Sequence, residues 1–120
     1  MKTINWIALF AAILFANTGI AQYKGPTSIK LYTVKEIKDN ASQLDKSDVL
    51  VKIEGFIVDR INDDTYWFQD SSGKIQVELE DDQIPEFPFD EKTKLIIVGE
   101  VDYDVLEEVE IEVEFIQLAK

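Results

Sequence analysis

The sequence predicts a mainly β fold, a small closed barrel of five strands that follows one N-terminal α-helix. First, a helical repeat of apolar residues is followed by five short segments rich in apolar and aromatic residues. In three of them apolar and polar residues alternate, and a period of two is typical of half-buried strands. Second, Gly55 and Gly99 interrupt two of these segments, as the sharp bends of small barrels require. Third, the whole pattern fits within residues 33–120, which suits one small barrel.

The helix is expected over residues 33–45. Thr33 and Glu36 have the spacing of a capping box, in which each side chain accepts a hydrogen bond from the backbone N–H of the other residue. The apolar residues recur at helical spacing and therefore share one face, which we expect to be buried. These residues are Val34, Ile37, Ala41 and Leu44.

Five strands are expected after the helix. A turn at residues 62–64 and a tight turn at residues 70–73 separate the first three strands, and a proline-containing loop over residues 81–93 precedes the fourth. One helix and five strands in this order best fit a five-stranded Greek-key barrel of the OB type. An open five-stranded sheet with the helix on one face is the alternative. The expected strands are 49–58, 65–69, 74–80, 94–102 and 108–114.

Residues 1–21 have the layout of a cleavable secretory signal peptide. Lys2 precedes an apolar run over residues 4–16, and small residues stand at Gly19 and Ala21, the positions that signal peptidase reads. The alternative is a membrane anchor, but the run is shorter than the roughly 18–20 apolar residues that span a bilayer. We therefore expect export to the periplasm, cleavage after Ala21 and no membrane span in the mature chain.

The expected organisation is a signal peptide, a short linking segment and one domain. Residues 22–32 would form an N-terminal extended segment after cleavage, because Gly25 and Pro26 favour neither helix nor strand. Residues 33–120 would form the OB-fold domain, including its helix. We expect this domain to be a monomer.

Composition excludes most kinds of catalytic site. The 120 residues contain no cysteine and no histidine, so the chain has no disulfide, no thiolate nucleophile, no Cys/His zinc site and no imidazole base. Carboxylates remain for acid–base work, but a filled barrel of this size offers no deep cleft, so we expect no enzymatic activity. The 24 acidic residues outnumber the 12 basic ones and give a net charge of −12, which argues against nucleic acid as a partner.

The loops that frame the ligand-binding surface of an OB barrel are acidic in this chain. Ligands of such barrels lie across strands two and three, between the loop that joins strands one and two and the loop that joins strands four and five. Carboxylate oxygens favour a cationic small molecule, a cationic envelope component, or weakly bound calcium or magnesium. The alternative is that these residues form turns and keep the domain soluble. The loop residues are Asp63, Asp64, Asp102, Tyr103 and Asp104.

An aromatic strand and the turn after it complete this candidate ligand-binding set. Alternation places Tyr66 and Phe68 on one face, expected to be the core, and Trp67 on the other face, where it could stack on a sugar or cover a cation. Asp70 begins the following turn, but residues 70–73 lack the ligand spacing of a calcium-binding loop. No firm metal site and no cofactor are therefore predicted.

The last two strands provide a second candidate surface, for docking on an envelope protein. Ile96 and Val98 are apolar at positions expected to point outward, and contiguous exposed apolar residues mark interfaces. The fifth strand adds outward carboxylates at Glu108, Glu110 and Glu112. A purely solvated, screened acidic surface is the alternative.

In an OB barrel the fifth strand pairs with the third, whose outward residues here include Glu78 and Glu80. Like charges on neighbouring strands repel each other. This surface would therefore either attract a cationic partner or require counterions.

Six segments of the chain resemble, in the same order, the bacterial OB-fold (BOF) family of YgiW/YdeI-type proteins. The resemblance covers nearly all of the chain after the predicted signal peptide. It implies a periplasmic OB-fold protein without known enzymatic activity that is associated with tolerance of envelope or chemical stress. The segments are residues 23–26, which read Tyr-Lys-Gly-Pro, and residues 51–58, 64–70, 72–77, 98–102 and 109–113.

Overall fold

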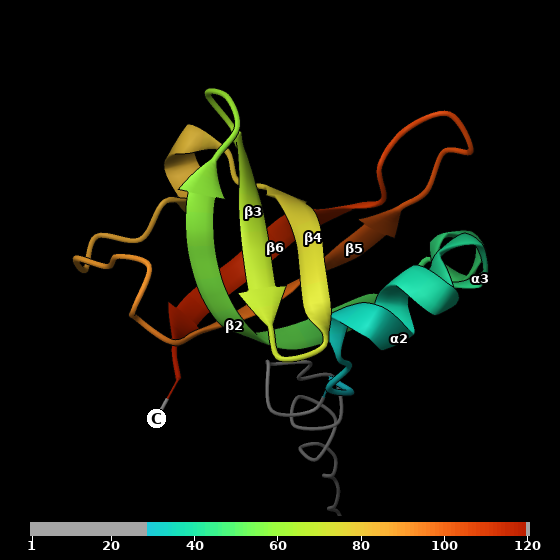
Figure 1. The fold of residues 1–120 in the computed structure, drawn as a ribbon, viewed down its shortest axis with the longest axis horizontal. Coiled ribbons are helices and arrows are strands. Elements are labelled where there is room, and N and C mark those ends of the chain that lie inside the picture. Colours follow the sequence, from blue (N-terminus) through green and yellow to red (C-terminus); the bar gives the residue numbers. More distant parts are fainter. Residues whose placement is uncertain (1–28, 120) are drawn as a thin grey trace, which may run out of the picture.

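The fold is that of a computed structural model, which describes residues 29–119. Five strands close into a barrel in the order β2–β3–β4–β6–β5, so the predicted fold class is confirmed (Figure 1). Neighbouring strands are antiparallel except β4 and β6, which are parallel. The predicted signal peptide and residues 22–28 lie outside the described residues. The elements are α2 (Val34–Asp39), α3 (Ala41–Ser47), β2 (Leu50–Arg60), β3 (Thr65–Asp70), β4 (Gly73–Glu78), the short 3-10 helix η3 (Asp81–Gln83), β5 (Leu95–Asp102) and β6 (Glu110–Leu118).

The single predicted helix is divided into two at Asn40. The predicted capping box is present: the Thr33 side chain accepts from Glu36 N–H at 3.1 Å, and the Glu36 carboxylate accepts from Thr33 N–H at 2.8 Å. Asn40 then leaves helical geometry, with φ −121° and ψ 22°. Its side-chain amide donates to Glu36 C=O at 2.8 Å, and its backbone N–H donates to the carbonyls of Glu36 and Ile37. An asparagine that bonds to its own backbone in this way ends α2, a competition that apolar periodicity does not reveal.

Separate segments cover the two ends of the barrel. Helices α2 and α3 pack against β4 and β5 at one end, on the right in Figure 1, and the loop between η3 and β5 lies at the opposite end. Phe87 and Phe89 of this loop pack against the core, and their rings meet edge to face with centroids 6.3 Å apart. Phe68 is a fully buried central side chain. The core is therefore filled by side chains from the strands, the helices and this loop.

Two glycines allow strands to approach closely. A Cβ at Gly99 would collide with the backbone carbonyl oxygen of Glu112 on β6, and a Cβ at Gly55 would collide with that of Gln69 on β3. The pairing of β5 with β6 also shifts register between Val98 and Gly99, as a β-bulge requires. The irregularity predicted at Gly99 is therefore present, whereas the register shift on β2 falls between Ile57 and Asp59 and not at Gly55.

Substitution of Gly99 tests this close approach. We expect Gly99→Ala to lower the free energy of unfolding by about 2–3 kcal/mol, because the atom in the way belongs to the backbone and cannot rotate aside. Urea unfolding followed by circular dichroism measures the change. Gln117→Ala, at an exposed position of β6, is the control and should cost less than about 0.5 kcal/mol. Equal losses in the two variants would contradict the close approach.

Candidate functional site

Acidic side chains from three strands and one loop meet on the outer surface of the barrel. Because β4 and β6 are parallel, Glu78 lies beside Glu112. On the other side of β6, Glu110 pairs with Asp102 of β5. Asp64, from the loop between β2 and β3, acts electrostatically on both Glu78 and Glu110. We term these five residues, Asp64, Glu78, Asp102, Glu110 and Glu112, the acidic face.

Burial and mutual repulsion raise the pKa of three glutamates on the acidic face. Partial burial is the largest cause for Glu78, Glu110 and Glu112, and neighbouring carboxylates raise each pKa further. A hydrogen bond with the carboxyl of Asp102 also raises the pKa of Glu112, because one of the two groups must hold a proton to donate it. The charged groups that act on these glutamates are all carboxylates. A proton or a cation would therefore relieve the repulsion.

The two aspartates of the loop between β2 and β3, Asp63 and Asp64, have different surroundings. Asp64 accepts a hydrogen bond from the Thr65 hydroxyl at 3.0 Å and faces the glutamates of the acidic face. Asp63 is fully exposed at 3.9 Å from the Arg60 guanidinium, which also donates to Asp63 C=O at 3.1 Å. Both aspartates line an open hollow of about 420 Å³, together with the acidic residues of η3 and Glu80. The structure thus extends the acidic surface toward η3.

Of the three residues predicted for the loop after the fourth strand, only Asp102, the last residue of β5, belongs to the acidic face. Asp104 accepts a hydrogen bond from Leu106 N–H at 2.9 Å and thereby shapes its own turn. Tyr103 N–H donates to the Asp45 carboxylate at 2.9 Å, which ties the loop to α3. The sequence predicted only that Asp45 belongs to the helix, so its contact with the loop was not predicted. Tyr103 and Asp104 therefore follow Asp102 in the sequence, but their hydrogen bonds stabilise the loop and its contact with α3.

Trp67 lies on the outer surface of the barrel, as alternation predicts. It pairs with Gln76 of β4, which in turn pairs with Glu110 of β6, so Trp67 and the acidic face share one side of the sheet. The Lys74 ammonium lies 5.4 Å from the centroid of the Trp67 ring. Tyr66 packs against the core and carries the Arg60 guanidinium 5.8 Å from its ring centroid. Trp67 therefore already covers a cation of the chain itself.

Asp70 is held by hydrogen bonds at the start of the hairpin between β3 and β4. Its carboxylate accepts from Ser72 N–H, Ser72 hydroxyl, Gly73 N–H and Val34 N–H at distances between 2.6 and 3.2 Å. Burial alone would raise the pKa of Asp70, but these hydrogen bonds outweigh burial and lower it. Asp70 lies away from the acidic face and joins the hairpin to α2.

The second candidate surface requires a correction at Val98. Val98 is 1% exposed and so cannot form part of an exposed strip, whereas Ile96 keeps partial exposure. The β-bulge between Val98 and Gly99 breaks the alternation, and both residues are buried. Phe115 of β6, which pairs with Val98, is the exposed apolar residue of this pair, at 50%. Glu108 is exposed and precedes β6.

The described residues contain no group of three or more His, Cys, Asp or Glu side chains arranged to hold a metal ion. A cation on the acidic face would therefore keep much of its water and bind through one or two carboxylates at a time. Glu110 and Glu112 were predicted for the docking surface and not for the ligand-binding set, and Glu78 belonged to neither set, although the expected pairing of the third and fifth strands pointed to it. Within residues 29–119, no helix is long and apolar enough to cross a bilayer.

The fold and this surface define a single OB-type barrel with an acidic face on β4, β5 and β6. The family model described as "Bacterial OB fold (BOF) protein" matches residues 16–118, and the chain belongs to this family. It is 34% identical over 120 residues to the calcium-regulated OB-fold protein CarO of Pseudomonas aeruginosa, covering 100% of this chain and 96% of the relative. It is 32% identical over 84 residues to an uncharacterised protein of Haemophilus influenzae, covering 70% and 68% of the two chains.

A solved structure supports the same assignment. The hypothetical protein ygiW from E. coli matches with a TM-score of 0.66 and 36% identity, over 81% of this chain and 97% of that chain. The resemblance found in the sequence segments is therefore confirmed at the level of family and fold.

The raised pKa values predict that stability increases as the pH falls from 7 toward about 5. A group whose pKa is higher in the folded chain binds its proton more tightly there, so protonation of Glu78, Glu110 and Glu112 favours the folded state and ionisation destabilises it. At pH 7, Glu112→Gln should raise stability by about 0.5 kcal/mol. This corresponds to roughly 2–4 °C in Tm for a domain of this size. Thermal melts between pH 5 and 7.5 measure both effects.

Glu91→Gln provides the matched control for this experiment. It removes one negative charge at an exposed position of the loop before β5, away from the acidic face. Its pH dependence should follow that of the unchanged protein, whereas Glu112→Gln should flatten it. A Tm that falls steadily between pH 7 and 5, or equal effects of the two substitutions, would contradict the repulsion on the acidic face.

Proposed function

We propose that this chain is an exported, non-catalytic binding module of the cell envelope whose acidic face takes polyvalent cations. The observation that carries the proposal is the set of three glutamates whose pKa values are raised by partial burial and, further, by neighbouring carboxylates. Binding of a cation removes a repulsion that the folded chain otherwise tolerates. Residues 1–21, with the layout of a secretory signal peptide, support export. The family resemblance supports a role in tolerance of envelope or chemical stress.

Calcium is the cation that the chemistry of the acidic face favours as a first probe. Calcium accepts six to eight oxygen ligands in flexible geometry and exchanges its water readily, so it can bridge carboxylates that do not form a closed cage. Magnesium demands a stricter geometry and gives up its water reluctantly. The relative in P. aeruginosa is named as calcium-regulated, which supports the same choice of probe. Binding by such an open surface is expected to be weak.

Calcium should therefore stabilise the protein through the acidic face. With a dissociation constant on the order of 1 mM, typical of extracellular calcium modules, 10 mM CaCl₂ should raise the free energy of unfolding by about 1.4 kcal/mol. The double variant Glu110→Gln/Glu112→Gln should lose most of this gain. Thermal melts of protein purified from the periplasm, compared with NaCl at equal ionic strength, measure the effect.

The control is the double variant Glu91→Gln/Glu107→Gln, which removes the same charge from exposed loop positions. It should keep the gain produced by calcium. If both double variants respond equally, calcium acts by general screening and the proposed cation site is wrong. Mass spectrometry of the same periplasmic sample tests export, because cleavage after Ala21 removes residues 1–21.

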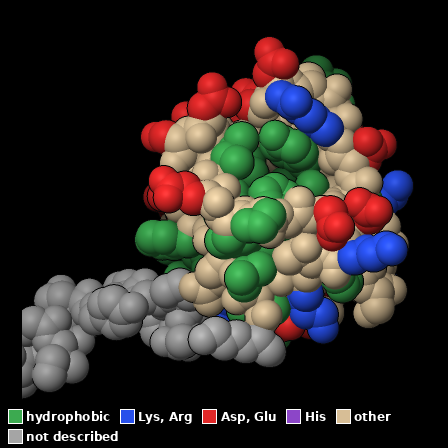
Figure 2. All heavy atoms as spheres, turned by 90° about the vertical axis from the view of Figure 1, so that its left-hand side faces the viewer, with side chains coloured by type: hydrophobic (Ala, Val, Ile, Leu, Met, Phe, Trp, Pro, Cys, Tyr) green, Lys and Arg blue, Asp and Glu red, His purple; other side chains and the backbone are tan. Residues whose placement is uncertain are grey.

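A second candidate function, docking on an envelope protein, is favoured by an apolar hollow at the end of the barrel away from the helices. Phe87, Ile96 and Leu118 line it together with Gln117. Figure 2 shows hydrophobic side chains gathered near the centre of this side of the molecule, with acidic side chains and some basic ones around them. An apolar centre inside a charged rim is the composition of many protein interfaces. A partner with a basic rim would complement it.

Docking at this hollow predicts that Ile96→Lys abolishes binding to the partner. Chemical crosslinking of the protein in intact cells, followed by mass spectrometry, should yield one saturable envelope partner that the variant no longer captures. The Glu110→Gln/Glu112→Gln variant serves as control and should still capture it, because the acidic face lies elsewhere on the barrel. If the Ile96→Lys variant still captures the partner, or if only the glutamate variant fails to capture it, the partner does not dock at this hollow.

A further inference from the structure

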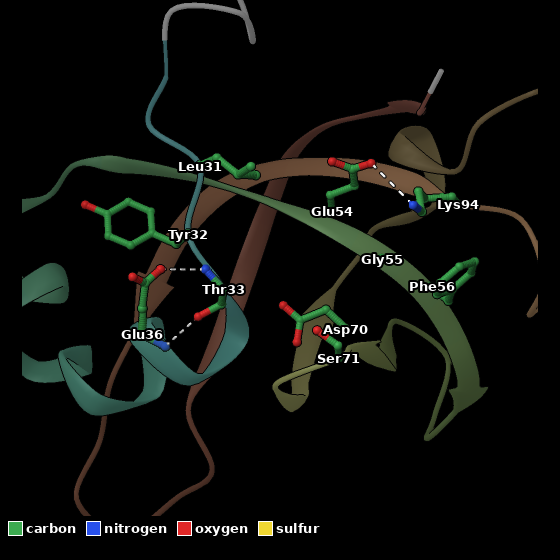
Figure 3. A pocket seen from close by; sticks show the side chains of 10 residues that line it. All are labelled: Leu31, Tyr32, Thr33, Glu36, Glu54, Gly55, Phe56, Asp70, Ser71 and Lys94. Atoms are coloured by element: carbon green, nitrogen blue, oxygen red, sulfur yellow. Dashed lines mark hydrogen bonds and ion pairs between the residues drawn. The ribbon is translucent and has the colours of Figure 1, made fainter.

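A groove of about 440 Å³ opens where the segment before α2 leaves β2 (Figure 3). Residues 30–32 pair with β2 at one point: Tyr32 N–H donates to Lys52 C=O at 2.8 Å, and Lys52 N–H donates to Lys30 C=O at 3.2 Å. The pairing of β3 with β2 begins only at Phe56, opposite Gln69. Between these two points the edge of β2 borders the groove.

This edge directs backbone polar groups toward the groove. The N–H and C=O of Lys52 point to the side of residues 30–32, and in a strand the groups two residues on point to the same side. Those of Glu54 therefore face the groove, while β5 pairs with the opposite edge of β2. The groove thus offers a backbone carbonyl as well as the side chains that line it.

Two half-buried aromatic rings stand at opposite ends of the groove. Figure 3 shows Tyr32 near α2 and Phe56 on β2, with Glu54 on one side between them and Asp70 and Ser71 on the other. The Lys30 ammonium lies 4.9 Å from the centroid of the Tyr32 ring, so this ring already interacts with a cation. Aromatic rings favour apolar chains and organic cations, and they offer nothing to a hydrated metal ion.

The charged side chains that line the groove are mainly acidic. Glu36, Glu54 and Asp70 contribute three carboxylates, and Lys94 contributes one ammonium. Glu54 lies 3.8 Å from Lys94, and Glu36 is fixed by the backbone N–H of Thr33. Hydrogen bonds from four donor groups orient Asp70. These contacts hold the carboxylates in place before any ligand arrives, which lowers the entropic cost of binding.

We propose that this groove binds an extended organic cation, an aliphatic chain that carries ammonium groups. The acidic walls would bind the ammonium groups, and the rings at the two ends would cover the apolar stem. A linear polyamine and the lysine side chains of an extended peptide share this chemistry. The site is separate from the acidic face, which has carboxylates but lacks the apolar walls. The proposal goes beyond the cation binding assigned to that face.

Nuclear magnetic resonance of the ¹⁵N-labelled protein tests the groove directly. Titration with spermidine should shift the amide signals of Thr33, Gly55 and Ser71 in a saturable way. Hexaamminecobalt(III), which carries the same charge as spermidine without an apolar stem, should leave these amides nearly unchanged and act mainly on the acidic face. A capped tri-lysine peptide forms the third arm. Whichever of spermidine and the peptide binds more tightly identifies the source of the ammonium groups.

Variants assign the binding to named side chains. Glu36→Gln/Glu54→Gln should weaken spermidine binding by about fivefold or more. The glutamine at position 36 can still accept the Thr33 N–H, so the helix cap is kept. Phe56→Leu retains apolar volume without the ring and should weaken binding by about threefold. Glu91→Gln/Glu107→Gln is the control for charge and should bind spermidine as the unchanged protein does.

Several outcomes would overturn the proposal. Shifts that spread over the whole acidic surface without saturation, equal shifts with hexaamminecobalt(III), or equal weakening in the control variant would each show that the groove has no selective site. The result is independent of the acidic face: Glu110→Gln/Glu112→Gln should lose most of the response to calcium and leave the spermidine shifts of Gly55 and Ser71 unchanged.

Discussion

The parallel pairing of β6 with β4 is the constraint on which the rest of the structure depends. It closes the barrel, and it fixes the register in which Val77 lies beside Ile111, both fully buried. A shift by one residue would turn these side chains outward and expose the apolar surface that stabilises the fold. The register that buries Ile111 therefore also places its neighbours, Glu110 and Glu112, on the outer surface among other carboxylates. The acidic face thus results from two things: barrel closure brings these outward positions together, and the sequence has carboxylates at them.

The magnitudes explain why the barrel tolerates this arrangement. A like-charged pair on neighbouring strands costs a few tenths of a kcal/mol to about 1 kcal/mol, whereas a fully buried valine or isoleucine contributes about 1.5–3 kcal/mol. Polar or basic residues at the same outward positions would serve the fold equally well. Solubility alone requires acidic residues somewhere on the surface, and carboxylates that raise one another's pKa are a costly way to provide them. The placement of the charges, more than their number, is therefore what argues for a cationic ligand.

Most of the fold could be predicted from the sequence, and less of the site. Alternation identified three of the five strands because each of them buries one face, and an aromatic segment and an apolar run identified the other two. The capping box identified the start of α2. The break at Asn40 was missed because it depends on a side chain bonding to its own backbone. Val98 was misplaced because a β-bulge inverts the alternation on which the prediction rested. Glu78 and Glu112 could be brought together only by assuming the strand order of the fold. The role of Asp70 in joining the hairpin to α2 needed tertiary contacts with residues 36 positions away.

The two surfaces to which we assign cations differ in the kind of cation that they can distinguish. The acidic face is open to water and presents only oxygen atoms, so its selectivity depends on charge and on how readily a cation exchanges its hydration shell. The groove beside α2 adds Tyr32 and Phe56 to its carboxylates, so an apolar stem contributes to binding and an inorganic ion gains little. The groove exists because residues 30–32 pair with β2 at a single point before the chain turns into α2. Residues 30–32 therefore form part of the folded domain and also lead into α2. One wall of the proposed groove is formed by residues that precede the first strand, Leu31 and Tyr32 among them.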